Sequence, residues 1–200
     1  MINEEKFQAL KKEYLSLLGK VNRDGIDQLI QFLEKSDFFE APSSAKYHSA
    51  YKHGLLEHSL NVYHNLIKVR ELFDSEHQIN DESLIIVALL HDLCKTGFYK
   101  IELANRKIDG IWKQVETYAY NDRFPCGHGE KSVIMAQRFI RLTSEEIMAL
   151  CWHMGGFDIR CMDYQGRTAI STAMEKYKLV CLIQMADTAA TFFDETRKGD

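Results

Sequence analysis

Apolar side chains recur at every third or fourth position in several stretches of the chain, which is the spacing of one face of an α-helix. The first stretch runs from Phe7 to Leu18 and predicts a helix that ends near Gly19. The second runs from Ile26 to Leu33, with Asp24 as a suitable N-cap. We expect residues 1–40 to form packing helices.

Two longer apolar stretches predict helices that are buried over a wide face. One runs from Leu55 to Phe73 and contains His58. The other begins at Asp81 as a predicted cap, continues through the apolar segment LIIVALL, and stops at the doublet His91-Asp92. The doublet is therefore expected at a helix end.

The pattern changes to alternation with a period of two between Phe98 and Tyr120. The segments YKIEL and WKQVETYAY are rich in aromatic and β-branched residues, and they flank the turn-forming stretch NRKIDG. This pattern predicts a β-hairpin.

Helical spacing returns after the hairpin. It predicts a helix from Lys131 to Ile140, then a helix that begins with a capping box, Thr143 and Glu146, and reaches His153. A loop follows, and the last predicted helix covers about residues 177–195. The sequence therefore predicts an all-α bundle with a β-hairpin insertion around residues 98–120.

Composition and charge narrow the class of protein. With 200 residues, 46% hydrophobic, 27% charged and two prolines, we expect a single globular domain over residues 1–200. A formal charge of −4 and a pI near 6.1 give no electrostatic footprint for tight binding to nucleic acid or anionic membranes. Small anionic substrates are the simpler interpretation.

Cysteine usage and the first residues bear on the compartment. The five cysteines contain no CxxC pair, and the opening MINEEKF lacks the pattern of a signal peptide. The longest apolar run, Leu84 to Leu90, is far shorter than the roughly 20 residues that cross a bilayer. We therefore expect free thiols, a cytoplasmic protein and no membrane partner.

The doublet His91-Asp92 is the sharpest chemical feature, because an imidazole and a carboxylate at the end of an apolar helix can bind one cation. Alone, such a pair more often only caps a helix end or faces solvent. Asp187 lies beside the apolar stripe of its helix, where a buried carboxylate needs a basic residue or a metal as partner. A lone histidine such as His58 is more often a core residue, but the convergence of three helices favours a metal site.

The order His58, His91-Asp92, Asp187 resembles the H…HD…D signature of the HD-domain metal-dependent phosphohydrolases. The resemblance covers roughly Tyr47 to Glu195 and implies an HD-domain helical bundle whose metal-binding core is residues 47–195.

The segment HSAYKHGLLEHS, residues 48–59, is especially similar to the HD domain of bacterial 3′–5′ exoribonucleases. In that subgroup the last histidine of the segment is the first ligand, which implies His58 and not His53 or His64. Lys95 matches the lysine of the HDxGK form, while Cys94 stands where a glycine is usual.

The resemblance also implies a second metal ion. In HD proteins with two ions, further histidines between the doublet and the last aspartate bind the second, and here these are His128 and His153, with Asp92 as the bridge. A solvated loop histidine and an ordinary helix-end histidine remain the alternatives. The ligand set suits Mn²⁺, Fe²⁺, Co²⁺, Ni²⁺ or Zn²⁺.

Other side chains are candidates for supporting roles. Lys95 is expected to stabilise phosphoryl oxygens, and Arg160 to grip a substrate phosphate, although each has a solvated surface position as the alternative. His48, His53 and Glu130 are candidates to orient ligands through hydrogen bonds.

Three functions fit these features. The leading hypothesis is a phosphohydrolase that cleaves an ester of a nucleotide or similar small molecule with a metal-activated water. The second is a 3′–5′ exoribonuclease that contacts RNA through Arg106, Lys107 and Trp112, although about 45 preceding residues are too few for an oligonucleotide-binding β-barrel. The third is a non-catalytic HD module that binds a nucleotide.

Overall fold

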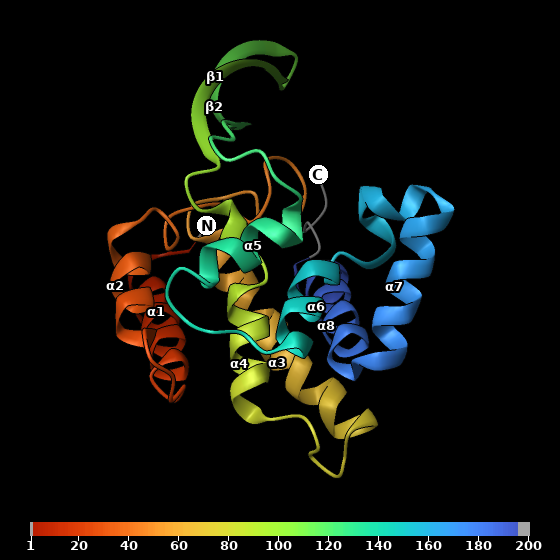
Figure 1. The fold of residues 1–200 in the computed structure, drawn as a ribbon. Coiled ribbons are helices and arrows are strands. Elements are labelled where there is room, and N and C mark those ends of the chain that lie inside the picture. The colour runs from red at the N-terminus through yellow and green to blue at the C-terminus, as the bar shows by residue number, and fades with distance from the viewer. Residues whose placement is uncertain (1, 196–200) are drawn as a thin grey trace.

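The computed structural model describes residues 2–195, apart from the side chain of residue 108. Within this range a helical bundle carries one projecting β-hairpin (Figure 1). The elements are α1 (Glu4–Leu18), α2 (Ile26–Lys35), α3 (Gly54–Phe73), α4 (Asp81–Leu90), β1 (Tyr99–Ile108), β2 (Ile111–Tyr120), α5 (His128–Ala136), α6 (Ser144–Trp152), α7 (Tyr164–Lys176) and α8 (Lys178–Ala189), with short 3₁₀ turns at Leu93–Lys95, Gly155–Phe157 and Ile159–Met162 and a π-helical turn at Ala190–Asp194. The predicted fold class is confirmed.

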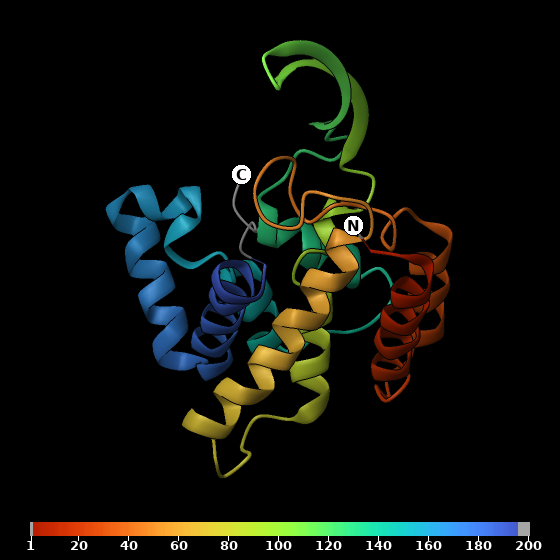
Figure 2. The ribbon, with the colours of Figure 1, turned by 180° about the vertical axis from the view of Figure 1, so that it is seen from behind.

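The core lies around α3 and α4, which cross in the middle of the bundle (Figure 2). Helices α1 and α2 cover one side, α7 lies on the opposite side, and α6 and α8 lie between α7 and the centre (Figure 1). Every residue of α4 from Ser83 to Leu90 is buried, as expected for a helix that is apolar on all faces. Because α4 is enclosed, the doublet that follows it is held inside the protein.

Two predicted N-caps are wrong. Helix α2 is preceded by Gly25, which has a φ of 90° and makes no side-chain cap, in place of Asp24. A Cβ at Gly25 would lie 1.8 Å from the carbonyl oxygen of Phe139, so this approach requires glycine. The cap of α4 is Asn80, whose side chain accepts a hydrogen bond from the Glu82 amide; Asp81 is the first helical residue.

The predicted hairpin is confirmed, with a shorter turn than the NRKIDG stretch. Strands β1 and β2 pair antiparallel from Tyr99 opposite Tyr120 to Ile108 opposite Ile111. The turn consists of Asp109 and Gly110, which both have positive φ, as in the type I′ turns that suit the twist of paired strands.

The C-terminal part differs most from prediction. The predicted 131–140 helix begins earlier and ends earlier, as α5, and the predicted capping box of α6 is confirmed. Helix α7 was not predicted: the Asp163 side chain caps it, and within it only Ile170 and Ala173 are buried, so it carries a weak apolar pattern. The predicted last helix is α8 followed by the π-helical turn.

Among the described residues, no helix combines the length and apolar character that crossing a membrane requires.

Candidate metal centre

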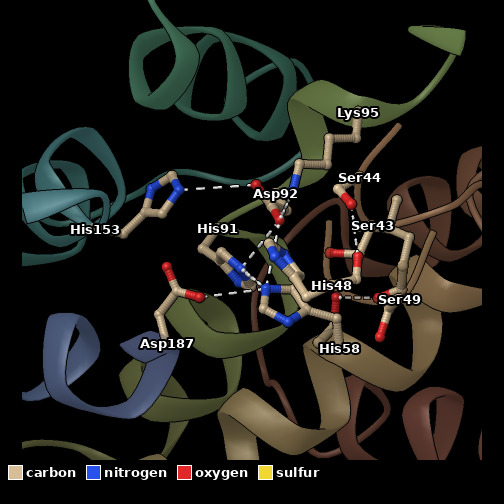
Figure 3. Close-up of polar contacts among 12 residues, drawn as sticks. Ser43, Ser44, His48, Ser49, His58, His91, Asp92, Lys95, His153 and Asp187 are labelled. Atoms are coloured by element: carbon tan, nitrogen blue, oxygen red, sulfur yellow. Dashed lines mark hydrogen bonds and ion pairs between the residues drawn. The ribbon is translucent and has the colours of Figure 1, made fainter. Parts of the chain in front are cut away.

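Four side chains of metal-ligand type converge at one buried point (Figure 3). His58 lies within α3, His91 and Asp92 directly follow α4, and Asp187 lies on α8. The side chains of the first three are at most 3% exposed, and that of Asp187 is 17% exposed. The packing of α3 against α4 and α8 therefore brings together residues that are far apart in the sequence.

Nitrogen and carboxylate oxygen atoms crowd around Nε2 of His58. This atom lies 3.1 Å from Nε2 of His91, 3.3 Å from Oδ1 of Asp187 and 3.6 Å from Oδ2 of Asp92. Ligand atoms bonded to one ion at about 2.1 Å lie about 3.0–3.4 Å from one another. The spacing of these donors therefore fits a single divalent cation.

The other oxygen of Asp92 faces a second pair of histidines. Its Oδ1 lies 2.8 Å from Nε2 of His128, the first residue of α5, and 3.7 Å from Nε2 of His153, which follows α6. The other ring nitrogen of His128, Nδ1, lies 3.4 Å from Sγ of Cys94. Asp92 thus presents one oxygen to each half of the cluster.

The Nδ1 atoms of three histidines are held by acceptors outside the cluster. Nδ1 of His91 and Nδ1 of His153 each lie 2.8 Å from the carbonyl oxygen three residues earlier, at the ends of α4 and α6. Nδ1 of His58 lies 2.9 Å from Oε1 of Glu195. Because a carbonyl or carboxylate oxygen only accepts, each Nδ1 donates its proton and each Nε2 points into the cluster. Metal-binding histidines are usually held in this way.

Burial and charge shift the pKa values in the cluster. Burial alone would raise the pKa of Asp92, but Lys95 and His91 outweigh it and hold that pKa well below its ordinary value. Burial, together with the neighbouring His91 and His128, lowers the pKa of His153 to about 3. His153 is therefore neutral at pH 7, and its buried Nε2 has no hydrogen-bond partner among residues 2–195. An unpaired buried nitrogen lone pair of this kind fits a metal ion.

His58 differs from His153. Burial would lower its pKa, but the charge of Glu195 and the hydrogen bond with Asp187 raise it to about 10. A metal ion bound at Nε2 would take the place of a proton. His58 and His153 are therefore held in different protonation states.

The structure brings Lys95 to the cluster, whereas the contacts of Arg160 are with residues outside it. Nζ of Lys95 is 2.5 Å from Oδ2 of Asp92. The guanidinium of Arg160 forms ion pairs with Asp158 and Glu130 and lies over the ring of Trp152, 4.0 Å from its centroid. These contacts join the start of α5 to the segment after α6.

Of the three residues predicted to orient ligands, His48 lies beside the cluster, whereas His53 and Glu130 bond to other residues. The ring of His48 lies 5.0 Å from that of His58, beside the cluster. His53 instead bonds the carbonyl oxygen of Phe39 and stacks on Phe7, and Glu130 pairs with Arg160. In the described residues, neither His53 nor Glu130 forms a hydrogen bond or ion pair with a predicted metal ligand.

Sequence reasoning missed the contacts of Glu195, which accepts hydrogen bonds from His58, Asn61 and Ser49. No motif marks this residue, because its position depends on the π-helical turn before it. Cys94 was noted as a departure from the usual glycine, and its contact with His128 was not foreseen.

A cavity of about 920 Å³ opens onto the cluster. His58, Asp92, Lys95, His153 and Asp187 form part of its lining. Exposed aromatic side chains also line it, namely Tyr47, Phe157 and Phe192. The volume suits a small organic molecule, and the cluster residues lie at one part of the cavity wall.

Comparison with known proteins identifies the class. The family model described as HD domain matches residues 55–191, which is more than half of the chain and includes His58, His91, Asp92 and Asp187. The chain belongs to the HD domain family.

Curated proteins similar to this chain include the dihydroneopterin 2′,3′-cyclic phosphate phosphodiesterase of Methanocaldococcus jannaschii, with 32% identity over 91 residues. The match covers 44% of this chain and 32% of that protein, so it spans about a third of the relative's length. No solved structure gave a significant match to the chain.

HD domains bind divalent metal ions, and the Methanocaldococcus relative is described as a phosphodiesterase. These matches do not confirm the narrower resemblance of residues 48–59 to exoribonucleases.

Proposed function

We propose that this protein hydrolyses a cyclic phosphodiester, or a related phosphate ester, of a small molecule that contains a planar ring, with two divalent metal ions. One observation carries the proposal: the two oxygens of Asp92 face two separate groups of histidine Nε2 atoms. A carboxylate that bridges two ions needs this arrangement.

In this proposal His58, His91 and Asp187 hold one ion together with Oδ2 of Asp92. His128 and His153 hold the other ion together with Oδ1. When bound, the ions supply a water of lowered pKa and positive charge for the phosphoryl oxygens. The ligand types favour Mn²⁺, Fe²⁺, Co²⁺, Ni²⁺ or Zn²⁺.

Lys95 has a defined part in the same reaction. Burial would lower the pKa of Lys95, but the charge of the neighbouring Asp92 outweighs it and raises that pKa, so the ammonium stays charged. Lys95 also lines the cavity, and a charged group there can bind a phosphoryl oxygen that enters beside Asp92. Lys95 therefore orients both the carboxylate and the ester in our proposal. Arg160 is not part of the proposed site, because its guanidinium is paired with Asp158 and Glu130.

The substrate class rests on the cavity and on the relative. Tyr47, Phe157 and Phe192 line the cavity and offer aromatic faces on which a planar ring can stack. The Methanocaldococcus relative is described as acting on a cyclic phosphate of dihydroneopterin. We therefore place the ring against these aromatic side chains and the phosphate at the metal cluster.

The test is a hydrolysis screen of the Mn²⁺-loaded protein against 2′,3′-cyclic nucleotides, 3′,5′-cyclic nucleotides, nucleoside monophosphates and a short RNA. We expect metal-dependent opening of a cyclic phosphate, and loss of at least 100-fold in rate for Asp92→Asn. Asp109→Asn is the matched control, because this exposed hairpin-turn aspartate undergoes the same chemical change in a position that suits asparagine. The proposal is wrong if the metal-loaded protein turns over no phosphate ester.

A second candidate, 3′–5′ exoribonuclease activity, is favoured by one observation. A groove of about 1020 Å³ runs between the hairpin and the N-terminal segments and reaches Glu195 beside the cluster. Its lining includes Lys6, Lys46, Arg106 and Tyr118, together with the acidic Glu57, Glu116 and Asp194. Lys107 and Trp112 are exposed on the same hairpin. Faster cleavage of the RNA than of any cyclic mononucleotide, with loss after Arg106→Ala, would favour this candidate over the first.

A further inference from the structure

Glu195 is buried at the edge of the metal cluster and makes three hydrogen bonds. Its side chain is 2% exposed. Oε1 accepts from Nδ1 of His58 at 2.9 Å and from Nδ2 of Asn61 at 3.0 Å, while Oε2 accepts from Oγ of Ser49 at 2.7 Å. Both carboxylate oxygens are therefore satisfied, and the orientation of the group is fixed from α3 and from the segment that precedes it.

The π-helical turn explains how Glu195 reaches His58. In an uninterrupted α-helix, eight residues of separation would place Glu195 about 80° around the axis from Asp187. The amide of Glu195 bonds the carbonyl oxygen of Ala190 at 3.1 Å, an i→i+5 bond that accommodates one extra residue. One extra residue turns the chain back by about 100°, which leaves Glu195 within about 20° of Asp187.

One C-terminal segment therefore contacts both nitrogens of one imidazole. Oδ1 of Asp187 lies 3.3 Å from Nε2 of His58, and Oε1 of Glu195 lies 2.9 Å from Nδ1. Among the four cluster histidines, His58 is the one whose Nδ1 faces a carboxylate; the others face a carbonyl oxygen or a sulfur.

We propose that Glu195 is a positioning residue that holds the proton of His58 on Nδ1 and directs the Nε2 lone pair toward a metal ion. This inference rests on the metal site of the proposed function. A carboxylate acceptor fixes the ring orientation and makes the imidazole a better donor to the metal. Asn61 and Ser49 keep the carboxylate in place.

A purely structural role, in which Glu195 only ties the end of α8 to α3, predicts a different result. Asp194 is the matched comparison, because its carboxylate also joins the π-helical turn to α3, through a 2.6 Å hydrogen bond from Asn65. If packing were the whole role, Asp194→Asn and Glu195→Gln would have similar effects. If Glu195 positions His58, only Glu195→Gln changes the metal site.

The experiment measures Zn²⁺ and Mn²⁺ binding by calorimetry and the ring-nitrogen NMR signals of His58 in the Zn²⁺-loaded full chain. We expect Glu195→Gln to lower the affinity for the ion held by His58 by 10- to 100-fold, which is the range found when outer partners of ligand histidines are removed. Asp194→Asn should stay within about twofold of the wild type, on the same outer-partner scale. In the wild type Nδ1 should carry the proton, and in Glu195→Ala, with no acceptor, this signal should weaken.

Wild-type affinity and an unchanged His58 signal in both Glu195 variants would overturn the inference. Glu195→Gln preserves the shape of the side chain, so it tests the charge even if Glu195→Ala does not fold. The proposed function fails separately: a wild-type protein that binds metal and shows the expected Glu195 effect, yet hydrolyses no phosphate ester, would refute the hydrolase and leave the positioning role intact.

Discussion

Gly129 lies where α5, which begins at His128, closely approaches α6, which His153 directly follows. A Cβ at this position would lie 2.4 Å from the carbonyl oxygen of Cys151 and 2.6 Å from that of Leu150. Ordinary contact of this kind begins at 3.4 Å, so Gly129→Ala must separate α5 from α6 by about 1 Å (3.4 − 2.4). His128 directly precedes Gly129, and its ring lies 5.2 Å from that of His153.

A displacement of about 1 Å exceeds the roughly 0.5 Å within which a functional constellation must be held. We therefore expect Gly129→Ala to lower the affinity for the second ion, the one assigned to His128 and His153, by at least 10-fold. The same substitution should lower the free energy of unfolding by about 1–3 kcal/mol. The first ion should bind normally, because His58 and Asp187 lie on other helices.

Calorimetric titration with Mn²⁺ checks this expectation, because two binding events should become one in the working concentration range. Gly156→Ala is the control for the same chemical change, since a Cβ there meets no atom within 4 Å in the described structure. Two ions bound to Gly129→Ala with wild-type affinities would refute the reasoning. Equal loss of both ions would show that the two halves of the cluster are not independent.

Three further predictions concern the site and the fold. His153→Ala should reduce the number of bound Mn²⁺ ions from two to one, measured by elemental analysis after dialysis, and two retained ions would contradict the assignment. Arg23→Met should destabilise the fold by about 3–5 kcal/mol in urea unfolding, because the fully buried Glu146 loses its bidentate partner at 2.6 and 2.7 Å; the double variant with Glu146→Met should recover most of that loss. The pKa of Glu146 is lowered because hydrogen bonds from Arg23 and Ser83 outweigh burial, so the stabilisation it provides is complete above the unfolded pKa near 4.5 and is lost as the pH falls through the lower folded pKa. Between pH 6 and pH 3 the unfolding free energy of the wild type should therefore fall more steeply than that of Glu146→Gln. Parallel curves for the two proteins would disprove this.

The sequence predicted the helices that have a regular apolar spacing and missed α7, which lacks one. Helices α3 and α4 have strong apolar patterns because they lie in the core, and the capping box of α6 is a local signal. Helix α7 has few buried positions, so its amphipathic pattern is weak and its start was taken for a loop. The N-caps at Asp24 and Asp81 failed because neighbouring residues, Gly25 and Asn80, suit the backbone better.

The site could be anticipated where ligand-type residues lie in apolar surroundings. His58, Asp92 and Asp187 are polar groups on buried faces, so the sequence itself indicates that each needs a partner. The position of Glu195 follows from one π-helical hydrogen bond, which no residue pattern revealed. The acidic neighbours of Arg160 are visible in the sequence, but their pairing with it depends on the fold.

The spread of the ligands along the chain has a consequence for folding. The cluster joins residues from His58 to Asp187, so an ion bound there closes loops of more than a hundred residues in total. During synthesis the first ion cannot acquire its full ligand set until residue 187 has left the ribosome and α8 has docked against α3. High-affinity metal uptake would therefore mark the completion of tertiary structure, and an ion already bound would slow unfolding in the manner of a reversible cross-link.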